Sequence, residues 1–205
     1  MRIQACNQLN ASTPLALCTF DNFSLSYYPN EPSDSGISAY QQMEQILRYC
    51  KAYAAQFSMD APNLLMQGGT GLGKTHLSLA IAREVIEKGY GVIYGSAQNM
   101  VTNLEKERFQ KDNEQQDTNQ LMLQCDLLII DDLGTEFSTS FVTAAIYNIV
   151  NTRLMTHKPT IISTNLSMKE LEERCTERFA SRILGSYIPL FFRGKDIRQQ
   201  KRRKK

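Results

Sequence analysis

The sequence is poor in the residues that build metal sites and disulfide frameworks. It contains two histidines, His76 and His157, and no tryptophan. Its five cysteines are widely spaced and form no C-x-x-C pair: Cys6, Cys18, Cys50, Cys125 and Cys175. This pattern argues against a structural zinc site. Scattered cysteines in odd number are typical of reduced thiols, so we expect a cytoplasmic protein.

Long hydrophobic runs are also absent. Apolar stretches reach only a few residues, as in Leu127–Ile130, whereas a helix needs about 20 apolar residues to cross a bilayer. The apolar patch at 15–18 is too short for the core of a signal peptide. The sequence therefore predicts no membrane partner.

Net charge is low, because 23 Lys and Arg nearly balance 21 Asp and Glu. The balance is uneven along the chain. Residues 193–205 hold eight of the basic residues and one acidic residue, which leaves the rest with a net charge of −5. A mildly acidic body argues against DNA binding by uniform basicity. The cluster 201–205 leaves two interpretations open, a solvated tail and a tether for the phosphates of DNA.

Length and hydrophobic pattern predict one α/β domain. A chain of 205 residues, 42% of them hydrophobic, is long enough to bury one core. Apolar strands are predicted at 63–67, 92–94, 127–131, 160–164 and 188–192. Amphipathic helices are predicted at 38–57, 73–88, 97–109 and 138–154, and another begins at Ser167 with a capping box. The alternation is typical of a parallel sheet of about five strands with helices on both faces.

The ends of the chain differ from this pattern. We expect an irregular N-terminal leader at 1–36, packed in part through Phe20 and Phe23. The domain would cover 37–200, and 201–205 would be a basic tail. Residues 110–120 are polar without an apolar face, which predicts an exposed loop or a frayed helix.

A glycine-rich motif follows the first predicted strand. It reads Gly68, Gly69, Thr70, Gly71, Leu72, Gly73, Lys74 and Thr75, which fits G-x-x-x-x-G-K-[ST]. Glycines let the backbone wrap around a phosphate chain, and the following helix N-terminus favours negative charge. Lys74 is expected to neutralise the β- and γ-phosphates of ATP, and Thr75 to place its hydroxyl on Mg²⁺.

Polar residues end two other predicted strands. Asp131 and Asp132 follow Leu127–Ile130, and carboxylates at the end of a buried strand usually have a function. Asp131 would hold Mg²⁺ through water, and Asp132 would polarise the attacking water. Asn165 follows the strand 160–164 and is expected to orient that water.

Arg178 and Arg182 are four residues apart, so they share one face of a helix. Two exposed arginines are usually part of a solvated surface. In ATPases that work as rings, however, an arginine is offered to the neighbour's γ-phosphate. Both interpretations stay open on the residues alone.

Taken in order, these motifs resemble the AAA+ module of bacterial replicative-helicase loaders of the DnaC/DnaI type, over about residues 20–200. The P-loop continues into His76 and Leu77, and Ile130–Gly134, Ser163–Leu166 and Glu177–Ile183 follow it along the chain. Transposition ATPases of the IstB type share most of this set. The resemblance implies a P-loop NTPase fold and ATPase activity with ATP and Mg²⁺.

The resemblance also assigns roles to single residues. Lys74 and Thr75 would belong to Walker A, with His76 as a further nucleotide-binding residue, and Asp131 and Asp132 to Walker B. Asn165 would be sensor 1. Arg182 looks like the arginine finger, with Arg178 as its companion, and Arg198 looks like the sensor 2 arginine.

Partners are implied as well: a replicative helicase of the DnaB family, single-stranded DNA, and an ATP-dependent homo-oligomer. Candidate DNA contacts are Phe109, Thr139, Phe141, Lys201, Arg202 and Arg203. Phe109 lies in the helical insertion of this family, here about 98–124, and could stack on a base. Core packing is the alternative for both phenylalanines.

Loaders of this type usually carry a separate N-terminal module that binds the helicase. Here about 36 irregular residues precede the first predicted helix. We therefore expect a shortened loader, a mobile-element variant, or one that works with a separate adaptor. Three other functions stay open: an IstB-like transposition-helper ATPase, a small-molecule kinase, and a nucleotide-gated binding module without useful hydrolysis.

Overall fold

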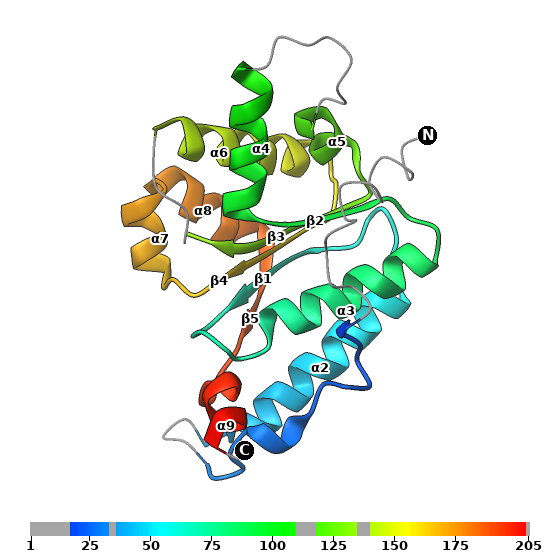
Figure 1. Cartoon of the computed structure of the whole chain (residues 1–205), viewed down its shortest axis with the longest axis vertical. Helices are drawn as coiled ribbons and strands as arrows, with labels where there is room; N and C mark the ends of the chain where they lie inside the picture. Colours follow the sequence, from blue (N-terminus) through cyan, green and yellow to red (C-terminus); the bar gives the residue numbers. More distant parts are fainter. Residues whose placement is uncertain (1–16, 33–35, 110–117, 135–139, 204–205) are drawn as a thin grey trace.

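A parallel five-stranded sheet forms the centre of the protein. The computed structural model describes residues 17–32, 36–109, 118–134 and 140–203 (Figure 1). The strand order is β2-β3-β4-β1-β5 and every pairing is parallel. The strands are β1 (Asn63–Gln67), β2 (Val92–Ser96), β3 (Leu127–Leu133), β4 (Thr160–Thr164) and β5 (Tyr187–Phe191). The predicted α/β P-loop fold is confirmed.

Helices cover both faces of the sheet (Figure 1). On one face lie α2 (Ala39–Ala55) and α3 (Lys74–Glu87). On the other lie α4 (Ala97–Phe109), α5 (Thr118–Gln124), α6 (Ser140–Met155), α7 (Met168–Arg174) and α8 (Glu177–Ser186). Capping boxes begin two of them, at Ser38 before α2 and at Ser167 before α7, the second as predicted.

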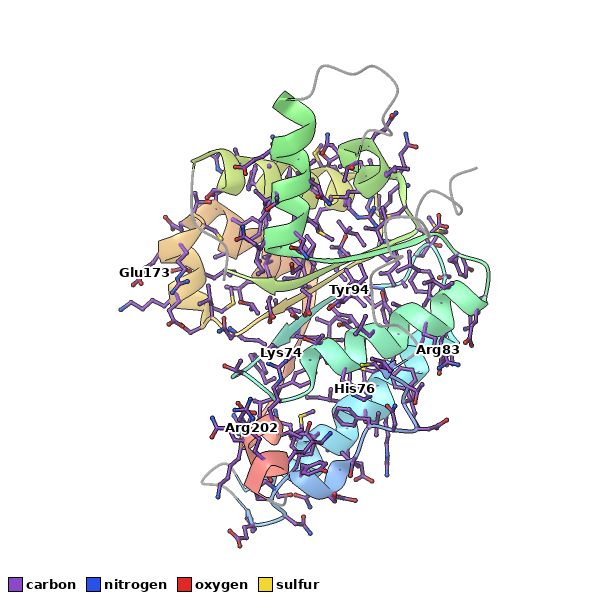
Figure 2. The ribbon with its side chains drawn as sticks, viewed as in Figure 1. Lys74, His76, Arg83, Tyr94, Glu173 and Arg202 are labelled. Atoms are coloured by element: carbon purple, nitrogen blue, oxygen red, sulfur yellow. The ribbon has the colours of Figure 1, made fainter. Side chains whose placement is uncertain are left out.

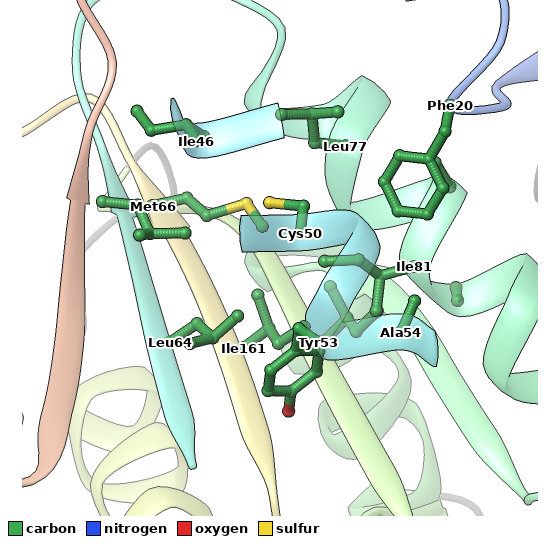
Figure 3. Close-up of a cluster of buried hydrophobic side chains, with 14 of the residues drawn as sticks. Phe20, Ile46, Cys50, Tyr53, Ala54, Leu64, Met66, Leu77, Ile81 and Ile161 are labelled. Carbon is green, nitrogen blue, oxygen red and sulfur yellow. The ribbon is translucent and has the colours of Figure 1, made fainter. Parts of the chain in front are cut away.

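The continuous apolar strands supply both cores. In β1, Leu64 and Met66 pack toward α2 and α3, whereas Leu65 packs toward the opposite helices. Successive side chains of a strand point to opposite faces, so a strand buried on both sides has apolar residues on both faces, as Leu64, Leu65 and Met66 of β1 show. Figure 3 shows part of the first core, where Cys50 of α2 lies beside Met66 of β1 and Ile81 of α3 belongs to the same cluster.

Two short helices were not delimited from the sequence. The first is α5, which lies at the end of the helical insertion expected over about 98–124 and in which Thr118 and Met122 are buried. Arg153 of α6 is fully buried and donates to the carbonyl oxygens of Met122 (2.8 Å) and Cys125 (3.0 Å), which ties α5 to α6. The second is α9 (Ile197–Arg203), which crosses residue 200, the predicted end of the domain.

Residues 17–32 of the N-terminal segment pack on the domain. Phe20, Phe23 and Tyr28 are buried in the core of α2 and α3, and a short 3-10 helix, η2 (Leu25–Tyr27), lies between the last two. Within the described ranges, no helix is both long and apolar enough to cross a membrane.

Candidate nucleotide-binding site

The glycine-rich loop joins β1 to α3, as its motif predicts. Its backbone is closely packed from outside: a Cβ on Gly71 would overlap the Asp196 carboxylate, and a Cβ on Gly73 would lie 2.7 Å from a ring carbon of Phe23. Both glycines have positive φ, +70° and +92°. Only glycine combines this backbone with such close neighbours. The loop is therefore fixed between the N-terminal segment and the residues that begin α9.

Lys74 lies at the start of α3 (Figure 2) and is buried except for 5% of its surface. Its ammonium donates to the carbonyl oxygens of Gly68 (2.7 Å) and Gly69 (2.8 Å). Burial lowers the pKa of Lys74, while the negative charges of Asp132 and Asp131 oppose that shift. The ammonium is thus held inside the loop, at the end of the helix that favours anions.

Asp131 accepts hydrogen bonds from one helix, α3, and from two strands, β2 and β4. Thr75 Oγ1 of α3 donates to Asp131 Oδ2 at 2.9 Å, and Tyr94 Oη of β2 donates to the same oxygen at 2.6 Å. The other oxygen, Oδ1, accepts from the Ser163 hydroxyl of β4. Burial and the Asp131 charge raise the pKa of Tyr94, so its hydroxyl keeps its proton. The carboxylate therefore has a fixed orientation beside Lys74 and Thr75.

Asp132 occupies an unusual backbone conformation. The register of β3 against β4 shifts between Ile130 and Leu133, and Asp132 has a φ of +53°. Its backbone N–H donates to Ser163 Oγ at 2.9 Å. This bulge directs the side chain into the cavity beside the P-loop. Burial and the charge of Asp131 raise the pKa of Asp132, and Lys74 and Arg198 partly compensate.

The N-terminal segment forms one wall of that cavity. His76 Nε2 donates to the carbonyl oxygen of Thr19 (2.8 Å), and the Phe23 ring meets the imidazole edge-on at 5.3 Å. Tyr28 donates from its hydroxyl to the Leu72 carbonyl oxygen at 2.8 Å. His76, predicted as a cofactor-binding residue, thus lines the cavity and joins the P-loop helix to this wall.

The opposite wall is α9. Asp196 Oδ1 accepts from the backbone N–H of Arg198 (2.8 Å), and the Ile197 N–H donates to Gly71 O (3.0 Å). The cavity between the walls measures about 380 Å³ and includes Arg198 next to residues 70–76 and Asp132. Ligand pockets of about 300–1,000 Å³ are typical for small molecules. The predicted residues Lys74, Thr75, Asp132 and Arg198 therefore meet in one cavity.

Other predicted residues lie elsewhere. Asn165 is exposed directly after β4, where Gly68 N donates to Thr164 O (3.2 Å), so it lies beside the start of the P-loop. Arg178 and Arg182 are exposed on α8. Among the described residues that line the P-loop cavity, neither arginine occurs.

The candidate DNA contacts are mostly outside the described structure. Thr139 lies outside the described residues, and so do the side chains of Phe109, Phe141 and Arg203. Lys201 and Arg202 are described and exposed on α9. Lys201 also lines the P-loop cavity.

Sequence reasoning missed Tyr94 and Ser163, the two further donors to Asp131. Each carries a hydroxyl near the carboxyl end of a strand, beside apolar residues (Val92–Ile93 and Ile161–Ile162), which was the available signal. The signal becomes specific only with the strand order, because β2 and β4 flank β3.

These residues fit a phosphate chain and a magnesium ion. Thr75 and Asp131 supply the hydroxyl and carboxylate oxygens that Mg²⁺ prefers, and they already lie within hydrogen-bonding distance of each other. When bound, the metal would neutralise phosphate charge. Lys74 and Arg198 would add positive charge on the protein's side, with no covalent chemistry needed.

The fold and this site define an α/β P-loop NTPase of the AAA+ type. The model of the IstB-like ATP-binding protein family matches residues 40–186. The chain belongs to this family of ATP-binding proteins.

Curated relatives include proteins named replicative helicase loader DnaC. The one from Buchnera aphidicola (subsp. Acyrthosiphon pisum) is 25% identical over 185 residues, 89% of this chain and 70% of that protein. The one from Escherichia coli K12 is 28% identical over 149 residues, 71% of this chain and 60% of that protein. The chain thus spans 60–70% of the length of these two relatives.

Solved structures share the fold. The DnaC helicase loader structure has a TM-score of 0.72 at 21% identity and covers 88% of this chain and 99% of that one. AMPPCP-bound DnaA from Aquifex aeolicus has a TM-score of 0.67 at 22% identity and covers 91% of this chain and 55% of that one.

Proposed function

We propose that this protein is an ATP- and Mg²⁺-dependent loader of the replicative DNA helicase that acts in the cytoplasm. One observation carries the proposal: the P-loop, Thr75 and Asp131 form an assembled site in a chain similar to DnaC loaders over 185 residues. ATP would bind along residues 68–75, and Thr75 and Asp131 would hold Mg²⁺. Adjacent copies would then assemble with the helicase and single-stranded DNA.

Hydrolysis would follow from positioning and charge neutralisation. Asp132 would polarise the attacking water, and Asn165 would orient it from the end of β4. Arg198 would contact the phosphates from α9. Arg182 would reach the γ-phosphate of a neighbouring copy with Arg178 beside it. Turnover would release the loader from the helicase.

Nucleotide binding is the first part of the proposal to test. Lys74→Ala removes the buried ammonium and should weaken ATP binding at least about 100-fold, since charge-assisted bonds to phosphate are among the strongest in proteins. Isothermal titration calorimetry measures this loss directly. Lys51→Ala, an exposed site on α2, is the matched control and should bind as the unchanged protein does. Normal ATP affinity in Lys74→Ala would reject the site.

The helicase is the second part. Tagged protein should retain the host's replicative helicase in the presence of ATP and Mg²⁺, and Lys74→Ala should retain much less. An unchanged yield of helicase with Lys74→Ala would argue that binding does not depend on the nucleotide. No retention under any condition would reject the loader assignment.

A second candidate function is supported by the family itself, whose description is IstB-like. An IstB-like helper would bind duplex DNA and recruit a transposase. The same tagged protein should then retain a transposase rather than a hexameric helicase. ATP turnover stimulated by duplex DNA, and not by single strands, would favour this candidate.

A further inference from the structure

The P-loop cavity extends beyond the residues that can bind phosphates. Its far end is lined by the N-terminal segment and by α9, through Asn22, Phe23, Ser24, Tyr27, Ile197 and Lys201. The phosphates of a bound nucleotide are fixed by the glycine loop and the start of α3. The base and sugar of a nucleotide bound in this way would occupy the far end, because it is the remaining part of the same cavity.

Helix α9 has a fixed orientation over this end. The Ile197 N–H donates to Gly71 O (3.0 Å) at one end of the helix. Near the other end, Gln200 Nε2 donates to the Tyr27 carbonyl oxygen (3.1 Å). Ile197 and Arg198 lie four and three positions before Lys201, so both neighbour Lys201 on the helix surface, and all three line the cavity.

The two cations on this face lie at different ends of the cavity. Arg198 acts electrostatically on Lys74 and Asp132, which places its charge at the phosphate end. Lys201 is one turn further along, with its ammonium 5.4 Å from the centre of the Tyr27 ring. A cation over an aromatic ring is held there by the negative ring face. Tyr27 thus keeps the Lys201 ammonium at the edge of the nucleoside end.

We propose that Lys201 binds the nucleoside part of the nucleotide, positioned by the ring of Tyr27. The first cation of the basic cluster would then serve ATP rather than DNA. The ammonium would donate to acceptor atoms of the base or sugar, which ATP and ADP share. This inference rests on the proposed nucleotide binding and assigns one more residue to it.

Arg202 provides the matched control, because it is the next residue on the same helix and is exposed but does not line the cavity. The inference predicts that two adjacent cations have different functions. A tail that only attracts polyanions would show no such difference, since both side chains would act through charge alone.

Calorimetry with unlabelled ATP and ADP on the full chain tests the inference. Lys201→Ala should lower the affinity for both nucleotides by the same factor, about tenfold, as expected for losing one charge-assisted hydrogen bond. Lys201→Arg should restore most of the affinity. Tyr27→Phe should bind normally because it keeps the ring, whereas Tyr27→Ala should lose affinity. Arg202→Ala should bind both nucleotides as the unchanged protein does.

Two results would overturn the inference. The first is equal nucleotide affinity in Lys201→Ala and Arg202→Ala. The second is a loss in Lys201→Ala that affects only single-stranded DNA. In both cases normal ATP binding by the unchanged protein would leave the proposed function standing. If the unchanged protein bound no nucleotide, the proposed function would fail and this inference with it.

Discussion

Charged residues are buried around the P-loop cavity and exposed on α8. Around the cavity, Lys74 and Asp131 are buried, and both side chains are hydrogen-bonded to other groups of this chain. On α8, Arg178 and Arg182 are exposed. The Arg182 guanidinium lies 5.9 Å from the centre of the Tyr147 ring, and Arg178 lines a separate cavity of about 640 Å³ between α6 and α8.

One copy of the chain therefore organises the nucleotide-binding groups, but leaves the arginines of α8 exposed to solvent. Buried, fully bonded groups are already organised for a ligand, so the chain holds by itself what nucleotide binding requires. A cation–π contact at an exposed site is worth only about 0.5–1 kcal/mol, so Arg182 can leave Tyr147 at little cost. We propose that binding is a property of one copy and hydrolysis a property of two.

Arg182→Ala should have the largest effect, because it should nearly abolish turnover without changing ATP binding. ATP should bind with unchanged affinity, because Arg182 does not line the P-loop cavity. Turnover should fall at least about 100-fold, in line with the loss of an arginine supplied to phosphoryl transfer. A steady-state phosphate-release assay beside calorimetry measures both quantities. Lys169→Ala, an exposed cation on α7, should change neither.

Phe23→Ala should lower stability and nucleotide binding through the P-loop cavity and leave the face of α8 unchanged. The ring is buried, contacts His76 and stacks near Tyr28, with centroids 6.0 Å apart. Truncation should reduce the free energy of unfolding by about 3 kcal/mol and weaken nucleotide binding. Chemical denaturation measures the first effect. Phe191→Ala, at an aromatic side chain that is 49% exposed, should cost much less. Equal losses in both variants would show that the N-terminal segment does not support the site.

Asp132→Asn should raise the melting temperature slightly, which is the smallest of the expected effects. Because the folded state raises the pKa of Asp132, ionisation is disfavoured there and costs stability at pH values above that pKa. The Asn variant cannot ionise, so its melting temperature should exceed that of the unchanged protein by about 1–2 °C at pH 7. Water still reaches this half-buried carboxyl, which keeps the effect small.

The pH dependence gives the sign of the Asp132 effect. The gain should shrink as the pH falls below the raised pKa of Asp132 in the folded state and vanish below about 4, where the carboxyl becomes protonated in the unfolded state as well. Asn also tolerates the left-handed conformation at φ +53°, whereas Ala does so poorly. Asp132→Ala should therefore melt below Asp132→Asn. A higher melting temperature of Asp132→Asn that persisted at pH 3 would contradict this explanation.

The sheet and the phosphate loop could be predicted because their signals are local. Strands β1 and β4 begin and end at the predicted residues, 63–67 and 160–164, since continuous apolar runs specify a strand buried on both faces. The P-loop motif likewise specifies its own backbone. Thr75 and Asp131 meet because the ends of parallel strands lie at one edge of the sheet.

The rest depends on contacts between distant residues. Tyr94 reaches Asp131 only because β2 lies beside β3. Helix α9 is short and polar, so it has no apolar period to detect. It is held by Gly71 and Tyr27, each more than 120 positions earlier in the chain. Composition alone therefore assigned Lys201 to a tail, whereas the structure shows it lining the cavity.

Mixing two inactive variants tests whether hydrolysis needs a P-loop from one copy and Arg182 from another. Lys74→Ala cannot bind ATP but keeps Arg182, and Arg182→Ala binds ATP but lacks the arginine. Each should be nearly inactive alone in ATP hydrolysis. An equal mixture should regain about a quarter of the turnover of the unchanged protein. In random head-to-tail assembly, one interface in four pairs an intact P-loop with an intact Arg182. A mixture no more active than its components, or full turnover by Arg182→Ala alone, would contradict the account.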